Sequence, residues 1–436
     1  MAHIVLNTFG SFGDLHPYLA LALGLKARGH DPVVATSAVY RRKVEAEGIG
    51  FAPVRPDVGE LLDRPEFVKK LWHPRLGSQY LIRDYLIPQV REGFLDLREA
   101  CQGANLLLTH AAAYAGPIVG EAMQIPWLSV ALQPAVFFSV FDPFVIPAIP
   151  WARHLYPLGH GVFRFLMWTA TKTMKGWVKP IRKLRREIGL PPTSKNPIMQ
   201  GQFSPFGSLA LFSRHFAQPQ ADWPPRTTQA GFVFYDQLGE GMPGMHDQEK
   251  QQGHSSLSEF LSSGPPPVLF TLGSSAVMQA GNFFTESLAA ARKLNIRAIM
   301  LVGNFDREQL PSTTPSIFVT NYLPYSEIMP KVAAIVHQGG IGTTAQGLRA
   351  GRPALVVPWS HDQPDNAERL RKLGVGRTIP RGQYRAKRVA KELNYLLSTK
   401  SYTERAQQMG VQIASEDGVS CACKAVEAAL ETTGRV

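Results

Sequence analysis

The stretch AAIVHQGGIGTTAQGLRAGRPALVVPWSHDQ, residues 333–363, decides the fold. It begins with an apolar run, 333–336, which has the length of a buried strand and ends at His337. A glycine-rich turn follows, and a helical pattern at 343–349 stops at Gly351. Free backbone N–H groups and the helix dipole converge at the start of such a helix, and glycines let a phosphate approach the backbone. The pattern therefore predicts an anion site between a strand and a helix.

A second apolar run, 354–357, leads directly into the polar residues of 359–363. In an open parallel sheet, ligands bind beyond the carboxyl ends of the strands. Two successive strand ends would then place a phosphate site beside a group of polar side chains suited to hydroxyls. We expect a ligand that is both phosphorylated and rich in hydroxyl groups.

Composition sets broad limits on the class of protein. A chain of 436 residues allows two or three domains, and 44% apolar with 18% charged residues is typical of an ordinary globular protein. Three cysteines are too few for a disulfide framework, and the pair Cys421 and Cys423 is too isolated for a zinc site. The N-terminus has no signal-peptide pattern, and no apolar stretch has the length of a membrane span. These features favour a cytoplasmic protein.

The formal charge of +12 is concentrated in one segment. Residues 151–190 contain nine Arg or Lys and one acid, a net of +8. No basic stripe with aromatic platforms and no nucleic-acid-binding motif is present, so we expect no nucleic-acid partner. Three interpretations of the segment stay open: a solvated helix face lining a binding cleft, peripheral contact with an anionic membrane, or attraction of an acidic substrate.

Strand and helix patterns alternate along both halves of the chain, which predicts an α/β fold. Residues 3–36 form a βαβ pattern, with Pro17 in the first helical turn, and therefore a parallel sheet. Further strands are expected at 51–54, 106–109, 127–130, 209–212, 268–272, 297–302 and 317–319, and a helix at 283–294. The proline-rich and basic segment 137–199 departs from the alternation and is typical of an insertion that shapes a binding cleft. We expect domains at 1–235 and 265–400, a polar, glycine-rich linker at 236–264 and a helical tail at 401–436.

Two stretches resemble a known family. HQGGIGTT (337–344) with AGRPALVVPWSHDQPDN (350–366) resembles the donor-binding signature of family 1 glycosyltransferases, and GSFGDLHPYLALALGLKARGHDPVVATS (10–37) resembles the start of the same enzymes. The likeness is nearest the bacterial rhamnolipid rhamnosyltransferase and sterol glucosyltransferase branch. It implies the GT-B fold, with two Rossmann-like parallel-sheet domains facing each other across a cleft. The N-terminal domain would bind the acceptor, and the C-terminal domain the nucleotide sugar.

The resemblance also implies roles for single residues of the donor site. His337 and the backbone of the glycine turn would hold the diphosphate, with a further contact from Ser274. Tyr322 would stack on the nucleobase, and Gln346 stands where the family has a glutamate that binds the ribose hydroxyls. An amide offers one acceptor and one donor, so a uridine and a thymidine nucleotide both remain open. The full expected donor set is Ser274, Tyr322, His337, Gly339, Gly340, Gly342, Thr343, Gln346, Asp362 and Gln363.

On the acceptor side, Asp14 matches the catalytic position of the antibiotic and sterol branches. The implied role is general base on the acceptor hydroxyl, with His16 as the rival, and His110 follows a strand that could face the same cleft. Taken alone, an Asp in this place would more often cap a helix.

The implied reaction is inverting, metal-independent transfer of a hexose from a UDP-glucose or dTDP-rhamnose type of donor. The acceptor would be a hydroxyl of a phenol, flavonoid, sterol or hydroxy-lipid. No cofactor beyond the co-substrate is implied, and no acidic cluster or His/Cys spacing indicates a metal site.

Two other functions compete with transfer as interpretations of the same sequence. One is epimerisation of the sugar nucleotide, which needs no acceptor pocket and so leaves the insertion 137–199 without a role. The other is a non-catalytic partner protein that only binds sugar nucleotides, and Asp14 argues against it.

Overall fold

The computed structural model describes residues 1–59, 64–235, 256–303, 305, 310, 314–432 and 434, and it divides into two compact units. The first unit contains 1–235 and 416–436, and the second contains 236–415. Of the expected linker, 236–255 lies outside the described residues. Residues 256–262 are helical, and Leu257 and Phe260 of this helix belong to the core of the second unit.

The first unit is built on a seven-stranded sheet in the order β3-β2-β1-β4-β5-β6-β7, and every neighbouring pair is parallel. Strands β1, β4 and β5 are buried from end to end or nearly so, as expected when helices cover both faces. The strands are β1 (His3–Asn7), β2 (Asp31–Thr36), β3 (Gly50–Pro53), β4 (Leu106–His110), β5 (Trp127–Ala131), β6 (Ser208–Ala210) and β7 (Thr227–Gln229).

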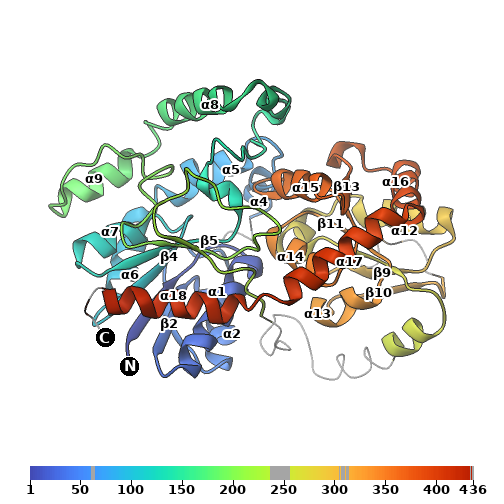
Figure 1. The fold of residues 1–436 in the computed structure, drawn as a ribbon, viewed down its shortest axis with the longest axis horizontal. Helices are drawn as coiled ribbons and strands as arrows, with labels where there is room; N and C mark the ends of the chain where they lie inside the picture. Colours follow the sequence, from blue (N-terminus) through green and yellow to red (C-terminus); the bar gives the residue numbers. More distant parts are fainter. Residues whose placement is uncertain are drawn as a thin grey trace. The chain divides into compact units, whose positions relative to one another are not determined.

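Helices surround this sheet, as Figure 1 shows. Apolar side chains of α6, α7 and α9 join those of β1, β2 and β4 in one core cluster. The helices are α1 (Phe12–Ala27), η1 (Ala38–Tyr40), α2 (Arg41–Ala46), α4 (Pro65–Leu71), α5 (Gly77–Gln79), the π-helical η2 (Tyr80–Leu86), α6 (Val90–Ala100), α7 (Ala115–Ala122), η3 (Pro134–Phe137), η4 (Pro150–Leu158), α8 (His160–Thr173), α9 (Lys179–Glu187) and α18 (Gly418–Thr432).

The second unit has a six-stranded parallel sheet in the order β10-β9-β8-β11-β12-β13. Its strands are β8 (Val268–Thr271), β9 (Ala298–Leu301), β10 (Ile317–Thr320), β11 (Ala334–His337), β12 (Ala354–Val356) and β13 (Gly376–Thr378). Its helices are α11 (Gly273–Ala276), η5 (Val277–Gln279), α12 (Phe283–Leu294), α13 (Tyr325–Ile328), η7 (Met329–Lys331), α14 (Ile341–Arg349), α15 (Gln363–Lys372), η8 (Arg381–Gln383), α16 (Ala386–Ser398) and α17 (Lys400–Ala414). Among these, α12 packs on α16 and α14 on α17.

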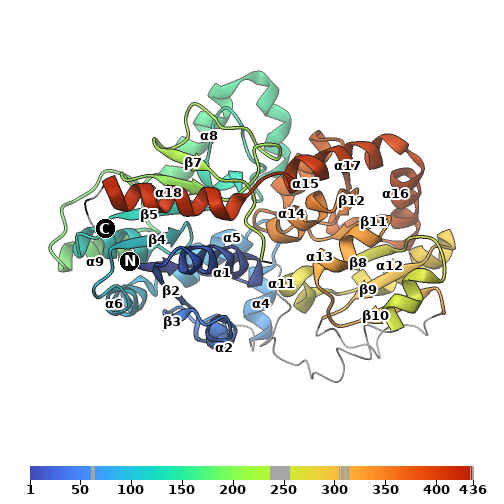
Figure 2. The same cartoon turned by 60° about the horizontal axis from the view of Figure 1, so that its bottom comes forward.

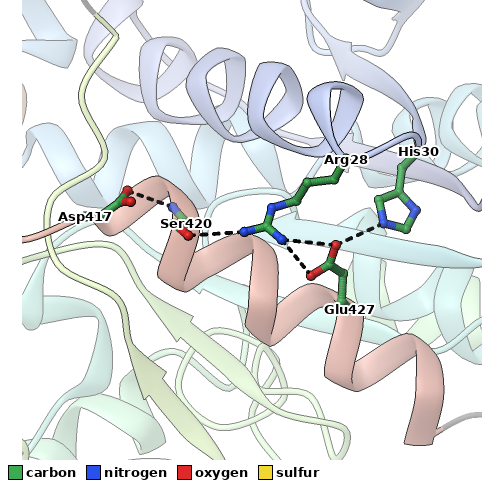
Figure 3. Close-up of polar contacts among 5 residues, drawn as sticks. All are labelled: Arg28, His30, Asp417, Ser420 and Glu427. Atoms are coloured by element: carbon green, nitrogen blue, oxygen red, sulfur yellow. Dashed lines mark hydrogen bonds and ion pairs between the residues drawn. The ribbon is translucent and has the colours of Figure 1, made fainter.

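Helix α18 returns the chain to the first unit and packs beside α1 (Figures 1 and 2). The Arg28 guanidinium lies 3.2 Å from the Glu427 carboxylate and donates to Ser420 Oγ, while His30 Nε2 lies 3.4 Å from the same carboxylate (Figure 3). These groups are partly exposed, so the ion pairs contribute at most about 1 kcal/mol. Burial of Ala422, Cys423, Val426 and Leu430 is the larger stabilising effect.

Gly24 lets α1 and α18 approach closely. A Cβ at this position would lie 2.6 Å from Val419 Cγ1 and 2.9 Å from Cys423 Sγ. We therefore expect Gly24→Ala to destabilise the first unit by about 1–3 kcal/mol, the usual cost of overpacking. Urea denaturation measures the loss. Gly161→Ala is the matched control, since no atom lies within 4 Å of its Cβ position; equal behaviour of the two variants would contradict the prediction.

The basic segment 151–190 contains two α-helices, α8 and α9, which differ in how much of their surface is buried. Helix α9 buries Ile181, Leu184 and Arg185, and the Arg185 guanidinium donates to both oxygens of Glu121 at 2.9 and 2.7 Å. Helix α8 buries only Phe163. In the part of the chain that the structure describes, no helix has both the length and the apolar character needed to cross a bilayer.

Candidate active site

Asp14 lies in the first turn of α1, directly after β1. Ser11 is the N-cap: its hydroxyl accepts from the Gly13 N–H, and Asp14 Oδ2 accepts from the Ser11 N–H at 2.7 Å and from the Ser11 hydroxyl at 3.3 Å. This is a capping box, with aspartate in the place of the usual glutamate. A Cβ at Gly10, which has φ +139°, would lie 2.1 Å from Asp14 Oδ2. The carboxylate thus folds back over a position that only glycine can occupy.

His110, the last residue of β4, faces this carboxylate. Its Nδ1 accepts from the Ala112 N–H at 3.3 Å, so the neutral ring holds its proton on Nε2, 3.9 Å from Asp14 Oδ1. The His110 side chain is 7% exposed, and among the described residues its Nε2 has no hydrogen-bond partner. A short movement would turn this contact into a hydrogen bond.

Burial sets the charges of the pair. It raises the pKa of the Asp14 carboxyl, against the opposing effects of His110 and Ser11. It lowers the pKa of His110, although the nearby Asp14 acts in the other direction. The arrangement therefore places a carboxyl group of increased basicity beside an imidazole whose protonated form is disfavoured.

His16, the other candidate base, lies in an aromatic cluster. Its ring centroid is 5.5 Å from that of Phe12 and 4.9 Å from that of Tyr235. Burial and the nearby Lys43 lower the pKa of His16 to about 4. Such packing is typical of a structural histidine, so the geometry favours Asp14 for proton transfer.

In the second unit, β11 ends at His337 and feeds the glycine turn that begins α14. His337 Nδ1 accepts from the Gly339 N–H at 3.0 Å, and burial lowers the pKa of His337 to about 3. The ring is therefore neutral and has its proton on Nε2. Gly340 is the N-cap and makes no side-chain cap hydrogen bond, so the first N–H groups of α14, at Gly342 and Thr343, are not satisfied by a capping side chain. The turn keeps the backbone donors that an anion requires.

Neighbouring loops lie against this turn. A Cβ at Gly273, with φ +67°, would lie 2.4 Å from Gln338 Nε2, which itself donates to Thr343 Oγ1 at 3.4 Å. Ser274, directly after Gly273, is exposed at the start of the four-residue α11. The ends of β8 and β11 thus bring Ser274 and the glycine turn into one region of the second unit.

Some polar side chains of the loop that follows β12 are already hydrogen-bonded within the protein. Gln363 is 4% exposed, and its Oε1 accepts from the Trp359 N–H at 2.8 Å, which leaves its amide nitrogen for a ligand. Asp362 Oδ2 accepts from Asn366 Nδ2 at 2.7 Å, and the same nitrogen lies 2.9 Å from the Gly339 carbonyl oxygen. Asn366 therefore joins the two loops. Sequence reasoning missed Asn366, although it ends the stretch 350–366 that resembles the donor-binding signature and follows Asp362 by four residues, on the same helix face.

The remaining two donor-site candidates are Tyr322 and Gln346. Tyr322 follows β10 and is half-buried, and burial, with smaller effects from Tyr325 and Glu327, raises its pKa to about 12. Gln346 lies on α14, where its Oε1 accepts from Arg349 Nη2 at 2.8 Å. Their contacts to a ligand remain predictions.

A cavity of about 530 Å³ opens beside His110 within the first unit. Its lining is largely aromatic and aliphatic, with a polar edge at His110 and at the Glu121–Arg185 pair. Apolar lining residues include Tyr114, Pro117, Ile118, Trp127, Phe203 and Phe206. This volume falls in the range that binds small molecules. No group of three or more His, Cys, Asp or Glu side chains that could hold a metal ion occurs among the residues described.

Comparison with known proteins defines the class. Residues 4–141 match the glycosyltransferase family 28 N-terminal domain, and residues 285–427 match the erythromycin biosynthesis protein CIII-like C-terminal domain. The chain is 32% identical over 439 residues to the O-mycaminosyltylonolide 6-deoxyallosyltransferase of Streptomyces fradiae, covering 98% of both chains. It belongs to the family 1 glycosyltransferases of the GT-B fold, and it is a hexosyltransferase.

Two further proteins extend the comparison. The sterol 3-beta-glucosyltransferase of Komagataella phaffii is 28% identical over 98% of this chain, which spans 34% of that protein's length. The crystal structure of the spinosyn rhamnosyltransferase SpnG complexed with thymidine diphosphate has a TM-score of 0.67 at 16% identity, covering 98% of this chain and 100% of that one. At that identity the likeness concerns the fold.

Proposed function

We propose that this enzyme transfers a hexose from a nucleotide-diphosphate sugar to a hydroxyl of a hydrophobic acceptor, with inversion and with Asp14 as general base. The observation on which this depends is the Asp14 carboxylate, made more basic by burial and lying beside the neutral His110. A positioned base of this kind accelerates proton transfer by typically about 10²–10⁴-fold.

The chemistry follows from the charges that must develop. The acceptor oxygen loses its proton to Asp14 and bonds to the anomeric carbon while the bond from that carbon to the diphosphate oxygen breaks. His110 Nε2–H steadies the carboxylate as its charge changes. Negative charge grows on the leaving diphosphate, where the N–H groups at Gly342 and Thr343 and the Nε2–H of His337 can stabilise it. Since these donors supply the stabilisation, the proposed reaction needs no metal and no cofactor.

The loop side chains of the second unit would contact the sugar and the base of the donor. Asp362 and the amide nitrogen of Gln363 would bind the sugar hydroxyls, and Tyr322 would stack on the base. Ser274 would add a contact to the diphosphate. The thymidine diphosphate in the spinosyn enzyme supports a dTDP-sugar, and the glucosyl transfer named for the sterol enzyme supports a glucosyl donor.

The acceptor is expected to be large and apolar. The named relatives act on a tylonolide derivative and on sterols. The cavity beside His110 would take the body of such an acceptor and direct its hydroxyl to Asp14. A phenol, flavonoid, sterol or hydroxy-lipid has this character.

The test is a screen of UDP-glucose and dTDP-rhamnose against phenolic and sterol acceptors in the presence of EDTA. We expect a glycoside whose anomeric configuration is inverted relative to the donor, as read by NMR. Retention of configuration, or activity only with added metal, would contradict the mechanism. Calorimetric titration with UDP and dTDP, run in parallel, separates failure of donor binding from the wrong choice of acceptor.

Gln346 offers a test of nucleotide choice. A carboxylate can accept from both ribose hydroxyls of a uridine nucleotide, whereas a thymidine nucleotide lacks one of the two, and Arg349 would hold the carboxylate in place. Gln346→Glu is therefore expected to shift the ratio of the UDP and dTDP dissociation constants toward UDP by about tenfold, equal to about 1.4 kcal/mol. Gln408→Glu, on the exposed face of α17, adds the same charge as a control. An unchanged ratio would remove Gln346 from the ribose site.

A further inference from the structure

Exposed apolar side chains gather on the segment that contains α8. Among the described residues, five of the twelve exposed large hydrophobic side chains fall between 141 and 168. They are Phe141, Trp151, Leu158, Phe165 and Trp168, with 43%, 59%, 76%, 62% and 57% exposed. Single exposed apolar residues are ordinary on a protein surface, but a gathering of this kind marks an interaction surface.

Helix α8 has its two largest aromatic side chains on the outside. Phe165 and Trp168 are three residues apart, which places them on one helix face, and their rings stack with centroids 6.0 Å apart. The inner face is occupied by Phe163, which packs edge-on against Phe144 and Tyr156. Figures 1 and 2 both show α8 at the margin of the first unit. Phe163 thus packs inward, while the outer aromatic pair is more than half exposed among the described residues.

Positive charge surrounds this pair. Arg164, Lys172 and Lys175 are exposed, and none of them forms an ion pair with an acid among the described residues. Lys172 Nζ lies 5.5 Å from the centre of the Trp168 ring. From residue 143 to 186 the sequence has no Asp or Glu at all. We call Arg164, Phe165, Trp168 and Lys172 of α8, together with Lys175 just beyond its end, the α8 face.

We propose that the α8 face docks this enzyme on an anionic phospholipid surface. Trp and Phe side chains favour the boundary between headgroups and acyl chains, and Lys and Arg around them pair with phosphates. A lipid surface fits better than a protein partner because the face carries one sign of charge and combines aromatic rings with long cationic side chains. Helix α9 would add charge only, because its apolar stripe is in the core.

Vesicle flotation tests the proposal without donor or acceptor, so its outcome is independent of the proposed transfer. We expect the wild-type chain to float with equal parts of phosphatidylcholine and phosphatidylglycerol, but not with phosphatidylcholine alone, and to be released at high salt. The charge variant Arg164→Gln/Lys172→Gln/Lys175→Gln is expected to bind about a hundredfold more weakly, since each basic residue near an anionic surface contributes about fivefold. The aromatic variant Phe165→Ser/Trp168→Ser should lose at least about tenfold.

Matched controls separate this face from general surface effects. Lys387→Gln/Lys391→Gln/Lys400→Gln removes three exposed cations of the second unit, and Leu95→Ser/Val411→Ser removes two exposed apolar side chains elsewhere. Both controls should bind vesicles as the wild type does. Absence of wild-type flotation, or equal flotation of the α8-face variants, would overturn the proposal. If the aromatic variant instead keeps vesicle binding and raises KM for a small acceptor, the rings belong to acceptor recognition.

Discussion

Replacing Asp14 by asparagine should lower kcat/KM for sugar transfer by about 10²–10⁴-fold, the usual contribution of a general base. The amide cannot take the acceptor proton, but its oxygen can still accept from the Ser11 N–H, so the start of α1 is retained. Affinity for the nucleoside diphosphate should stay within about twofold, because the proposed donor contacts lie in the other unit. Steady-state kinetics and calorimetry on the same preparation measure both quantities.

The pH dependence of the wild-type enzyme gives an independent view of the same group. Burial raises the pKa of Asp14 above its ordinary value of 3.8, so kcat/KM should fall as pH drops through that raised pKa. The same shift means that the folded state binds the proton more tightly than the unfolded chain does. Stability therefore decreases as pH rises from 3.8 through the raised pKa, and Asp14→Asn should unfold at the same or a higher temperature than the wild type at pH 7.

Ser11→Ala is the control for a purely structural role. It removes the hydroxyl that accepts from the Gly13 N–H, at an expected cost of about 1 kcal/mol, but it keeps the Asp14 carboxylate and should keep most of the activity. An Asp14→Asn enzyme with full activity would move the base role elsewhere, and His110, whose Nε2 lies 3.9 Å from Asp14 Oδ1, would be one candidate.

Gly339→Ala is expected to weaken nucleoside diphosphate binding at least about a hundredfold, equal to about 2.7 kcal/mol. Gly339 has φ +91°, and a Cβ there would lie 2.7 Å from Val356 Cγ1 and 3.1 Å from the Gln363 carbonyl oxygen. The turn has to shift, and with it the N–H groups that would bind the diphosphate. Each hydrogen bond to a charged group is worth about 1.5–3 kcal/mol, so the loss of one or two accounts for the effect.

Gly382→Ala is the matched control for this variant. It lies in the same unit, its φ is not positive, and no atom lies within 4 Å of its Cβ position. We expect its UDP and dTDP affinities to equal those of the wild type. Circular dichroism shows whether Gly339→Ala remains folded. A folded Gly339→Ala protein with wild-type affinity would remove the glycine turn from the donor site.

The fold around the glycine turn could be predicted from sequence because its signals are local. The apolar run at 333–336 became β11 (Ala334–His337), and the helical pattern at 343–349 became α14, which begins two residues earlier at Ile341. The expected helix at 283–294 has the observed bounds of α12. Buried parallel strands and a glycine-initiated helix are defined within a dozen residues, so no tertiary information was needed.

The site was harder to predict from the sequence, because its geometry depends on pairs of residues that are far apart in the chain. Asp14 and His110 are 96 positions apart, and nothing in either local pattern requires them to meet. They meet because β1 and β4 are neighbours in the sheet, so that both strand ends open on the same edge. The difference between the surroundings of Asp14 and those of His16 also arises only in the folded protein. His16 packs on Tyr235, which is more than 200 residues later in the chain. The composition of 151–190 also did not predict that α9 would pack into the core while α8 stays largely exposed.

The packing of α18 on α1 has a consequence for the order in which the chain is made. The second unit lies wholly between 235 and 416, so in topological terms it is inserted into the first. All of residues 236–415 are therefore synthesised before the ribosome reaches α18, the helix that covers Gly24. Until α18 emerges, the surface of α1 that receives Val419 and Cys423 stays open, so the first unit is completed only after the second has been synthesised.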